Sequence, residues 1–272
     1  MMLTEVRGLV IRTVDIKETD RLITIFTEQM GAVTALARGA RSLKSRKMAA
    51  TMQFCYGNFI LYSRDDKMWV KEAELIESFF DIRQSIEGLA LAGYIAEVLS
   101  DVTIAEAEAD LLRLSLNSLY AIAKGRYSLD KIKAAFEIRC ASILGFMPDV
   151  LECHACGGGE GDFFFDIMGG YIECAACRAE AAESGALPLD PHESRIVAIL
   201  SEGAKIALGY CIYSPIERIF AFNVADDDMR LFSRATEEYL LNQLGHSYKT
   251  LDFYKEIALK EQDNYGVKNE SI

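Results

Sequence analysis

The first 77 residues alternate apolar and polar positions in short runs that are rich in β-branched side chains, which is typical of strands. Five such runs are expected, at residues 6–14, 21–27, 32–38, 54–62 and 68–76. A longer segment separates the third run from the fourth, and a polar hairpin turn at 63–66 separates the last two. The pattern favours a five-stranded Greek-key barrel of the OB type, with a generic five-stranded sheet as the alternative.

From about residue 84 the apolar positions repeat with a helical period. Three apolar stripes predict three helices: Leu91, Ile95, Val98, Leu99 and Val102; Leu112, Leu116, Leu119, Tyr120 and Ala123; Ile132, Ala135, Phe136, Cys140, Ile143 and Leu144. A loop-rich, glycine-dense stretch covers 149–186, and helices are expected to resume around 191–202 and at 226–244. The predicted fold class is α+β, with an OB-type domain at 1–80 and a helical domain at 81–272 that carries a zinc-binding region at about 150–180.

Charge is distributed unevenly along the chain. The formal net charge is −12, but residues 1–80 carry 12 Lys and Arg against 10 Asp and Glu. No acidic residue occurs between Glu28 and Asp65. A local basic excess attracts polyanions that the rest of an acidic protein repels. The predicted DNA-contacting residues of this stretch are Arg38, Arg41, Lys44, Arg46 and Lys47. The alternative is a basic loop that is simply solvated. Nearby aromatic residues offer stacking surfaces for bases, and none is singled out: Phe54, Tyr56, Tyr62 and Trp69.

Four of the seven cysteines form two CxxC pairs separated by 17 residues. They are Cys153, Cys156, Cys174 and Cys177. This spacing predicts a closed tetrahedral site for one structural Zn²⁺, with a two-stranded ribbon between the pairs. A redox CxxC is the alternative, although such a site uses one pair beside a βαβ unit. His154 lies inside the first pair and is not expected to be a ligand. A zinc deaminase is excluded because the chain has no H-x-E step.

The sequence also lacks several signatures. No run of eighteen apolar residues and no export signal is present, and three cysteines lie isolated in apolar surroundings, so we expect a cytoplasmic protein without a membrane span. There is no GxxxxGK[ST] loop, so ATP hydrolysis is not expected. The acidic cluster Asp226–Asp228 fits a helix start better than the metal site of a nuclease, and no catalytic residue is predicted.

Arg139 interrupts the third apolar helical stripe. One interpretation is an arginine that pairs with an internal carboxylate. The other is a pocket with an apolar lining that receives a carboxylate of a partner protein.

Several motifs together resemble the bacterial DNA repair family RecO. They are Gly8-Leu-Val-Ile-Arg12, Glu18-x-Asp20-Arg-Leu-x-Thr24, Gly31, Ala37-Arg-Gly-Ala-Arg41-Ser42, Leu144-Gly-Phe-x-Pro148, and the cysteine pairs with Gly169-Gly170 between them. The resemblance runs from residue 3 to about residue 250. It implies an N-terminal OB-fold, a helical domain and an embedded zinc-binding region, although not every member of the family keeps the cysteines. The acidic helical part departs from the more basic members.

The resemblance also implies a function. The family binds single- and double-stranded DNA, anneals complementary strands, and works with RecR to help RecA displace the single-strand-binding protein (SSB). Its members engage the acidic C-terminal tail of SSB on the helical domain, and Arg139 fits that role in type. We therefore expect a non-enzymatic recombination mediator in DNA repair that is associated with the nucleoid. A zinc-ribbon transcription regulator that binds DNA is the alternative.

Overall fold

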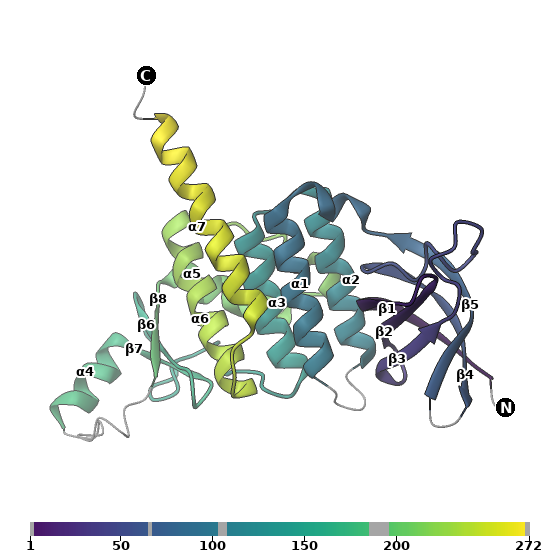
Figure 1. Ribbon diagram of the computed structural model, residues 1–272. Coiled ribbons are helices and arrows are strands. Elements are labelled where there is room, and N and C mark those ends of the chain that lie inside the picture. The colour runs from purple at the N-terminus through teal and green to yellow at the C-terminus, as the bar shows by residue number, and fades with distance from the viewer. Residues whose placement is uncertain (1–2, 65–66, 103–107, 185–195, 270–272) are drawn as a thin grey trace. The chain divides into compact units, whose positions relative to one another are not determined.

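The computed structural model describes residues 3–64, 67–102, 108–184 and 196–269 (Figure 1). The chain divides into two compact units. The first combines Met1–Arg126 with Tyr248–Ile272, and the second spans Tyr127–Ser247. The division at residue 80 that the sequence suggests stays a prediction.

The first unit begins with a closed five-stranded barrel, as predicted (Figure 1). Its strands are β1 (Leu3–Ile16), β2 (Asp20–Thr27), β3 (Gly31–Ala37), β4 (Cys55–Arg64) and β5 (Lys67–Ser78). Their order around the barrel is β1-β2-β3-β5-β4, with β3 and β5 parallel and the other neighbours antiparallel. Alternate side chains fill the interior, among them Val10, Ile23, Ile25, Phe59 and Leu61. The residues between these interior positions therefore face outward and form the surface of the barrel.

Among its described residues, this unit also contains a short 3-10 helix η1 (Phe80–Gln84) followed by three α-helices. They are α1 (Ile86–Asp101), α2 (Glu108–Lys124) and α7 (Lys249–Asn269). The Ser85 hydroxyl caps α1 by accepting a hydrogen bond from the Gly88 amide at 2.9 Å. The start of α7 is fastened to α1, because Thr250 donates to the Glu97 carboxylate and the Tyr248 hydroxyl donates to Asp101 at 3.0 Å.

The second unit combines helices with a three-stranded sheet of order β7-β6-β8. Its elements are α3 (Leu129–Ile143), β6 (Phe163–Asp166), β7 (Tyr171–Cys174), α4 (Ala175–Glu183), β8 (Val197–Leu200), α5 (Glu202–Tyr213), η2 (Ile216–Arg218) and α6 (Asp226–Leu244). The ribbon between the cysteine pairs is therefore confirmed as β6 and β7. Helix α6 also has the predicted bounds, and Gly245 ends it in the left-handed conformation at φ 77°.

The predicted helix at 191–202 is wrong where the structure describes it. Residues 191–195 lie outside the described residues, and the next residues form strand β8. The reason is tertiary: β8 pairs with β6, and Ala198 and Leu200 are buried on one face of that sheet while Ile199 points outward. Helix α5 begins only after Ser201, whose hydroxyl caps it.

Among the described residues, none of the helices has the length and apolar character needed to cross a membrane.

Candidate nucleic-acid interface and metal centre

The segment between β3 and β4, residues 38–54, carries the predicted DNA-contacting residues and is called the basic loop here. Two bonds fix its start to the turn between β1 and β2. The Gly39 amide donates to Asp20 at 2.8 Å, and the Arg41 amide donates to the Thr19 carbonyl at 2.9 Å. Gly39 adopts φ 64°, a left-handed conformation that suits glycine and lets the chain leave β3 sharply. The loop is thus attached to the barrel itself.

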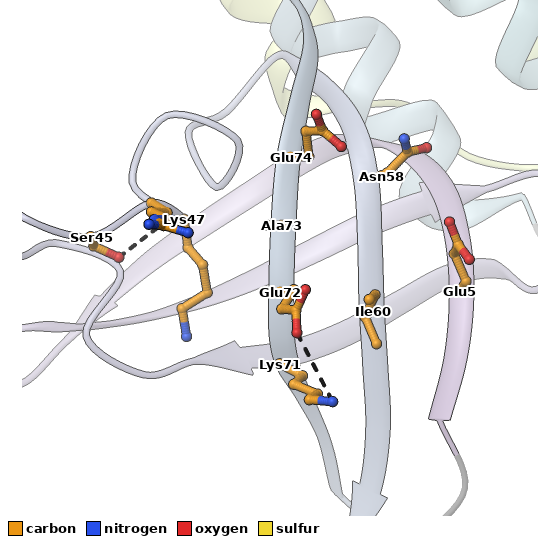
Figure 2. A pocket seen from close by; sticks show the side chains of 10 residues that line it. Glu5, Ser45, Lys47, Asn58, Ile60, Lys71, Glu72, Ala73 and Glu74 are labelled. Carbon is orange, nitrogen blue, oxygen red and sulfur yellow. Dashed lines mark hydrogen bonds and ion pairs between the residues drawn. The ribbon is translucent and has the colours of Figure 1, made fainter.

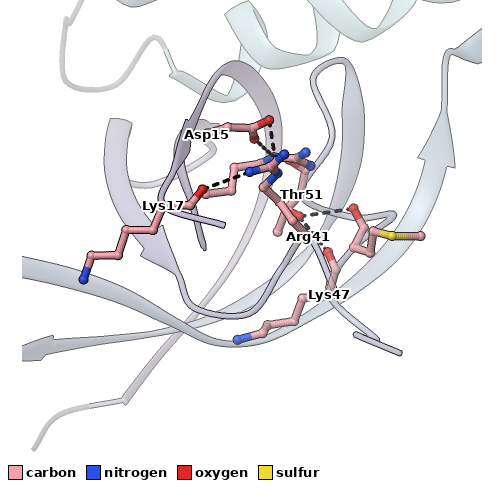
Figure 3. Close-up of polar contacts among 7 residues, drawn as sticks. Asp15, Lys17, Arg41, Lys47 and Thr51 are labelled. Atoms are coloured by element: carbon pink, nitrogen blue, oxygen red, sulfur yellow. Dashed lines mark hydrogen bonds and ion pairs between the residues drawn. The ribbon is translucent and has the colours of Figure 1, made fainter. Parts of the chain in front are cut away.

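Two of the predicted cations have partners on the barrel, and Figure 3 shows those of Arg41. The Arg41 guanidinium lies 3.2 Å from the Asp15 carboxylate and donates to the Lys17 carbonyl at 3.0 Å. Asp15 also accepts a bond from Arg21 at 2.9 Å, and this bond lowers the pKa of Asp15. Lys47 donates to the Val70 carbonyl at 3.4 Å, and its burial lowers its pKa. Because the side chain of Asp15 is 48% exposed, its pairs are weak and can be exchanged for a ligand anion.

The other three cations are exposed to solvent. Lys44 and Arg46 form no ion pair within the part of the chain that the structure describes. The third, Arg38, places its guanidinium carbon 4.2 Å from the centre of the Trp69 ring. Leu43 lies between Arg41 and Lys44 and is 90% exposed. The structure therefore keeps the five predicted cations on one loop, but in three different environments.

The basic loop and the outer face of the barrel line an open cavity of about 380 Å³ (Figure 2). Its lining comes from the loop and from β1, β4 and β5: Glu5, Ser45, Arg46, Lys47, Asn58, Ile60, Lys71, Glu72, Ala73 and Glu74. The stretch from 29 to 64 has no acidic residue, but the fold brings three carboxylates from neighbouring strands to this cavity. Strand register explains it, because Ile60 stands opposite both Glu5 and Glu72. Sequence reasoning missed this mixture of signs.

An aromatic pair lies on the same outer face. Tyr62 and Trp69 stand opposite one another on β4 and β5, with ring centroids 6.3 Å apart and planes 14° apart. Both rings are partly exposed, whereas Phe54 is buried. The sequence offered four aromatic candidates, and burial together with strand pairing distinguishes these two.

The four cysteines of the two CxxC pairs converge in the second unit. Their sulfur atoms all lie within 4.8 Å of one another, and the sulfurs of Cys156 and Cys174 are 3.9 Å apart. Cys153 and Cys156 lie in the loop before β6, Cys174 ends β7, and Cys177 lies in the first turn of α4. A tetrahedral Zn²⁺ with Zn–S distances of about 2.3 Å places its sulfurs roughly 3.8 Å apart. The cluster therefore has the dimensions of a four-thiolate metal site.

Backbone geometry supports the same interpretation. The Cys174 amide donates to the Cys153 sulfur at 3.2 Å. Burial raises the pKa of the Cys153 thiol, but amide hydrogen bonds lower it more, to about 6, which favours the thiolate that a metal binds. Hydrogen bonds with the sulfurs of Cys156 and Cys174 raise the pKa of Cys177. Four thiolates in so small a space need a cation, which this cluster is shaped to hold. His154 instead stacks on Tyr171, with centroids 4.4 Å apart.

Arg139 lies on α3 and is half-buried. Its guanidinium donates to the Ser214 carbonyl, which follows α5. Its role toward a partner protein stays a prediction. Asp226–Asp228 begin α6, where the Ser201 hydroxyl donates to Asp228.

A buried ion cluster that sequence reasoning missed lies between α3, which carries Lys133 and Glu137, and α6, which carries Glu237. The Lys133 ammonium is 3.1 Å from Glu137 and 2.8 Å from Glu237, and the Thr236 hydroxyl donates to Glu137 at 3.0 Å. The side chains of Lys133 and Glu137 are 3% and 0% exposed. The sequence did contain a signal for this pair, because Lys133 and Glu137 are four residues apart in an otherwise apolar helix and therefore lie on the same face.

Comparisons with known proteins cover almost the whole chain. A family model described as Recombination protein O N terminal matches residues 1–79, and one described as Recombination protein O C terminal matches residues 83–252. The DNA repair protein RecO of Acetivibrio thermocellus is 36% identical over 91% of this chain and 94% of its own length. The protein of that name from Bacillus pumilus is 32% identical over 73% of this chain and 77% of its own length. The corresponding protein of Clostridium acetobutylicum is 28% identical over 84% and 87%.

Proposed function

The chain belongs to the recombination protein O (RecO) family of DNA repair proteins, and from this premise we propose that it is a non-enzymatic recombination mediator. In this role it binds single-stranded DNA on the barrel and anneals complementary strands. With RecR it helps RecA to replace SSB on the strand. It therefore works at the nucleoid and also contacts double-stranded DNA.

The observation that carries this proposal is the basic loop on the barrel of an otherwise acidic chain. Lys44 and Arg46 are exposed, and Arg38 and Arg41 lie on the same loop. Cations in such a loop neutralise phosphates and release counterions, which binds any sequence alike because phosphates carry no sequence information. The carboxylates of Glu5, Glu72 and Glu74 repel a strand from the cavity floor, so we place its path along the outer side of the loop.

Strand annealing follows from the same charges. Two complementary strands repel one another, and cations that screen their phosphates reduce that repulsion. Bases that remain exposed on the bound strand can then pair with those of the second strand. We assign the SSB tail, whose acidic residues need a cationic partner, to the second unit near Arg139.

Salt-dependent binding tests the DNA site. If three to five phosphates are contacted, the logarithm of the affinity for a random single strand should fall with the logarithm of salt at a slope of about −2 to −3.5. Replacing both Lys44 and Arg46 with Ala should reduce the steepness by about 1.4 and weaken all sequences alike. Arg230→Ala is the matched control, because Arg230 is an exposed arginine of the second unit.

Two outcomes contradict the proposal. A salt slope near zero would show that the protein contacts no phosphates. Strong preference for one duplex sequence over random single strands favours a zinc-ribbon transcription regulator instead.

We also propose that the four cysteines hold one structural Zn²⁺. When bound, the metal would cross-link a small loop-rich region. The four cysteines would fill its coordination sphere, which leaves no position for a substrate. Cys153→Ser should lose the metal and lower the melting temperature of the second unit, while the barrel still folds. Metal analysis of freshly purified protein checks this, and a wild-type preparation without stoichiometric zinc contradicts it.

A further inference from the structure

The outer face of the barrel carries an exposed apolar row across three strands. Leu3 on β1, Tyr62 on β4 and Trp69 on β5 stand in register with one another. Leu3 is 49% exposed, and both rings are partly exposed. We call Tyr62 and Trp69 the aromatic pair. Flat, partly exposed rings that lie nearly parallel present a surface to which another flat, apolar group can be added.

The face of Trp69 is occupied by a flat cation. The Arg38 guanidinium lies 4.2 Å from the ring centre, which is the distance of a stacked cation–π contact. Arg38 follows directly after β3, and Leu36 of β3 pairs with Trp69 of β5. The indole Nε1–H of Trp69 is buried and has no hydrogen-bond partner among the described residues. Stacking and packing, rather than a hydrogen bond, therefore hold this ring in place.

The neighbours of the aromatic pair are the groups that bind a phosphate backbone. Arg38 and Arg41 lie three residues apart on the basic loop, and Arg41 is attached to the turn between β1 and β2. In barrels of the OB type, the loop between the first two strands and the loop between the last two border the bound strand. Trp69 lies at the beginning of β5, just after the second of these loops. Aromatic surface and cations together are the combination that recognises single strands.

We propose that Trp69, extended by Tyr62, is a base-stacking site, and that Arg38 covers this site in the free protein. When a strand binds, the guanidinium moves from the indole to a phosphate, and a nucleobase takes its place on the ring. The inference rests on the proposed binding of single strands to the barrel. It adds a base contact that phosphate neutralisation alone does not supply, without sequence preference because every base has a π face.

The chain contains one tryptophan, so its emission reports on this site directly. The experiment titrates the full-length protein with an oligothymidine and with an abasic strand of the same length and charge. Binding is followed separately by competition with a labelled strand. We expect both strands to bind at low salt, the abasic strand roughly 10-fold more weakly. Only the base-bearing strand should quench the tryptophan.

Direct contact is tested by photo-cross-linking. A strand that contains bromouracil should cross-link on irradiation to the peptide that carries Trp69. Trp69→Phe keeps an aromatic ring and should retain most of the affinity. Trp69→Ala and Tyr62→Leu should each weaken binding of the base-bearing strand by up to about 10-fold and change binding of the abasic strand little. The retained binding of the abasic strand shows that these variants are folded.

Arg38 is tested against Arg41, its neighbour on the loop. Arg38→Lys keeps the charge and removes the flat guanidinium, so we expect an unchanged salt slope but an altered emission of the free protein. Arg41→Ala should reduce the slope and leave the free emission unchanged.

The outcomes separate this inference from the proposed function. If the base-bearing strand binds with normal salt dependence and no change of emission, or the abasic strand quenches equally, the stacking site is refuted and phosphate binding stands. A cross-link confined to peptides without Trp69 also refutes the stacking site and leaves phosphate binding intact. If neither strand binds, the proposed function and the stacking site both fail.

Discussion

The buried ion cluster of the second unit makes stability depend on pH in a direction that is unusual for a carboxylate. One ammonium, Lys133, faces two carboxylates, Glu137 and Glu237. Burial alone would lower the pKa of Lys133, but these carboxylates raise it, so the lysine stays charged. With both carboxylates ionised, the cluster has a net negative charge inside the protein. A proton on one carboxyl removes that charge.

The pH at which that proton dissociates is determined mainly by the burial of Glu137. Desolvation raises the pKa of Glu137 from 4.5 to about 7, against the opposing effect of Lys133. Between these two values the folded chain binds more protons than the unfolded chain, so stability falls as the pH rises through this window. The stability is fully present below 4.5 and is lost as the pH passes about 7. The free energy of unfolding therefore falls by about 3 kcal/mol across this window, because each unit of pKa difference between the folded and unfolded states corresponds to about 1.4 kcal/mol.

Glu137→Gln tests this, because glutamine has the shape of the protonated acid and does not titrate. The variant should match the wild type at about pH 4 and exceed its unfolding free energy by about 3 kcal/mol at about pH 8. Urea unfolding followed by far-ultraviolet circular dichroism measures the difference, in which the titrations of groups outside the cluster cancel. Glu238→Gln is the matched control, because Glu238 lies on α6 beside Glu237 and pairs with exposed Arg234.

The opposite substitution adds a second arm. Lys133→Met leaves two carboxylates without their ammonium and should cost about 3–5 kcal/mol near neutral pH. A constant difference between Glu137→Gln and the wild type from about pH 4 to about pH 8 refutes the reasoning, because no carboxyl of the cluster would then titrate in this window.

Two further predictions concern the other sites. Gly159→Ala should destabilise the cysteine cluster by about 1–3 kcal/mol and weaken metal binding, because Gly159 adopts φ 105° and a Cβ there would lie 2.4 Å from the Cys174 Cβ. The control is Gly158→Ala, whose Cβ would meet nothing within 4 Å. This control should change neither the melting temperature nor the metal affinity measured by competition. Asp15→Asn should strengthen single-strand binding, because it removes a carboxylate that competes with the strand for Arg41. Equal affinities of the variant and the wild type would show that Asp15 does not compete for Arg41.

Local patterns predicted the features that depend on neighbours in the sequence. Strand β4 alternates in burial along most of its length and the other barrel strands do so in part. The two CxxC pairs have the spacing of a metal site, so both features were visible without a structure. Strand β8 was missed because a run of four residues has little periodicity. Its partner β6, about thirty positions earlier, decides its conformation.

The charges around the basic loop show why the site could be predicted only in part. A count along the chain found a stretch without acidic residues, but electrostatic interactions depend on distance in space. The fold places Asp15 against Arg41, and strand register adds Glu5 and Glu72 to the cavity beside Lys47. The net potential of this face is therefore smaller than the local sequence indicates. Charge alone then supports modest affinity, so a strand held firmly here needs a second kind of contact, and the aromatic surface beside the loop is where the barrel offers it.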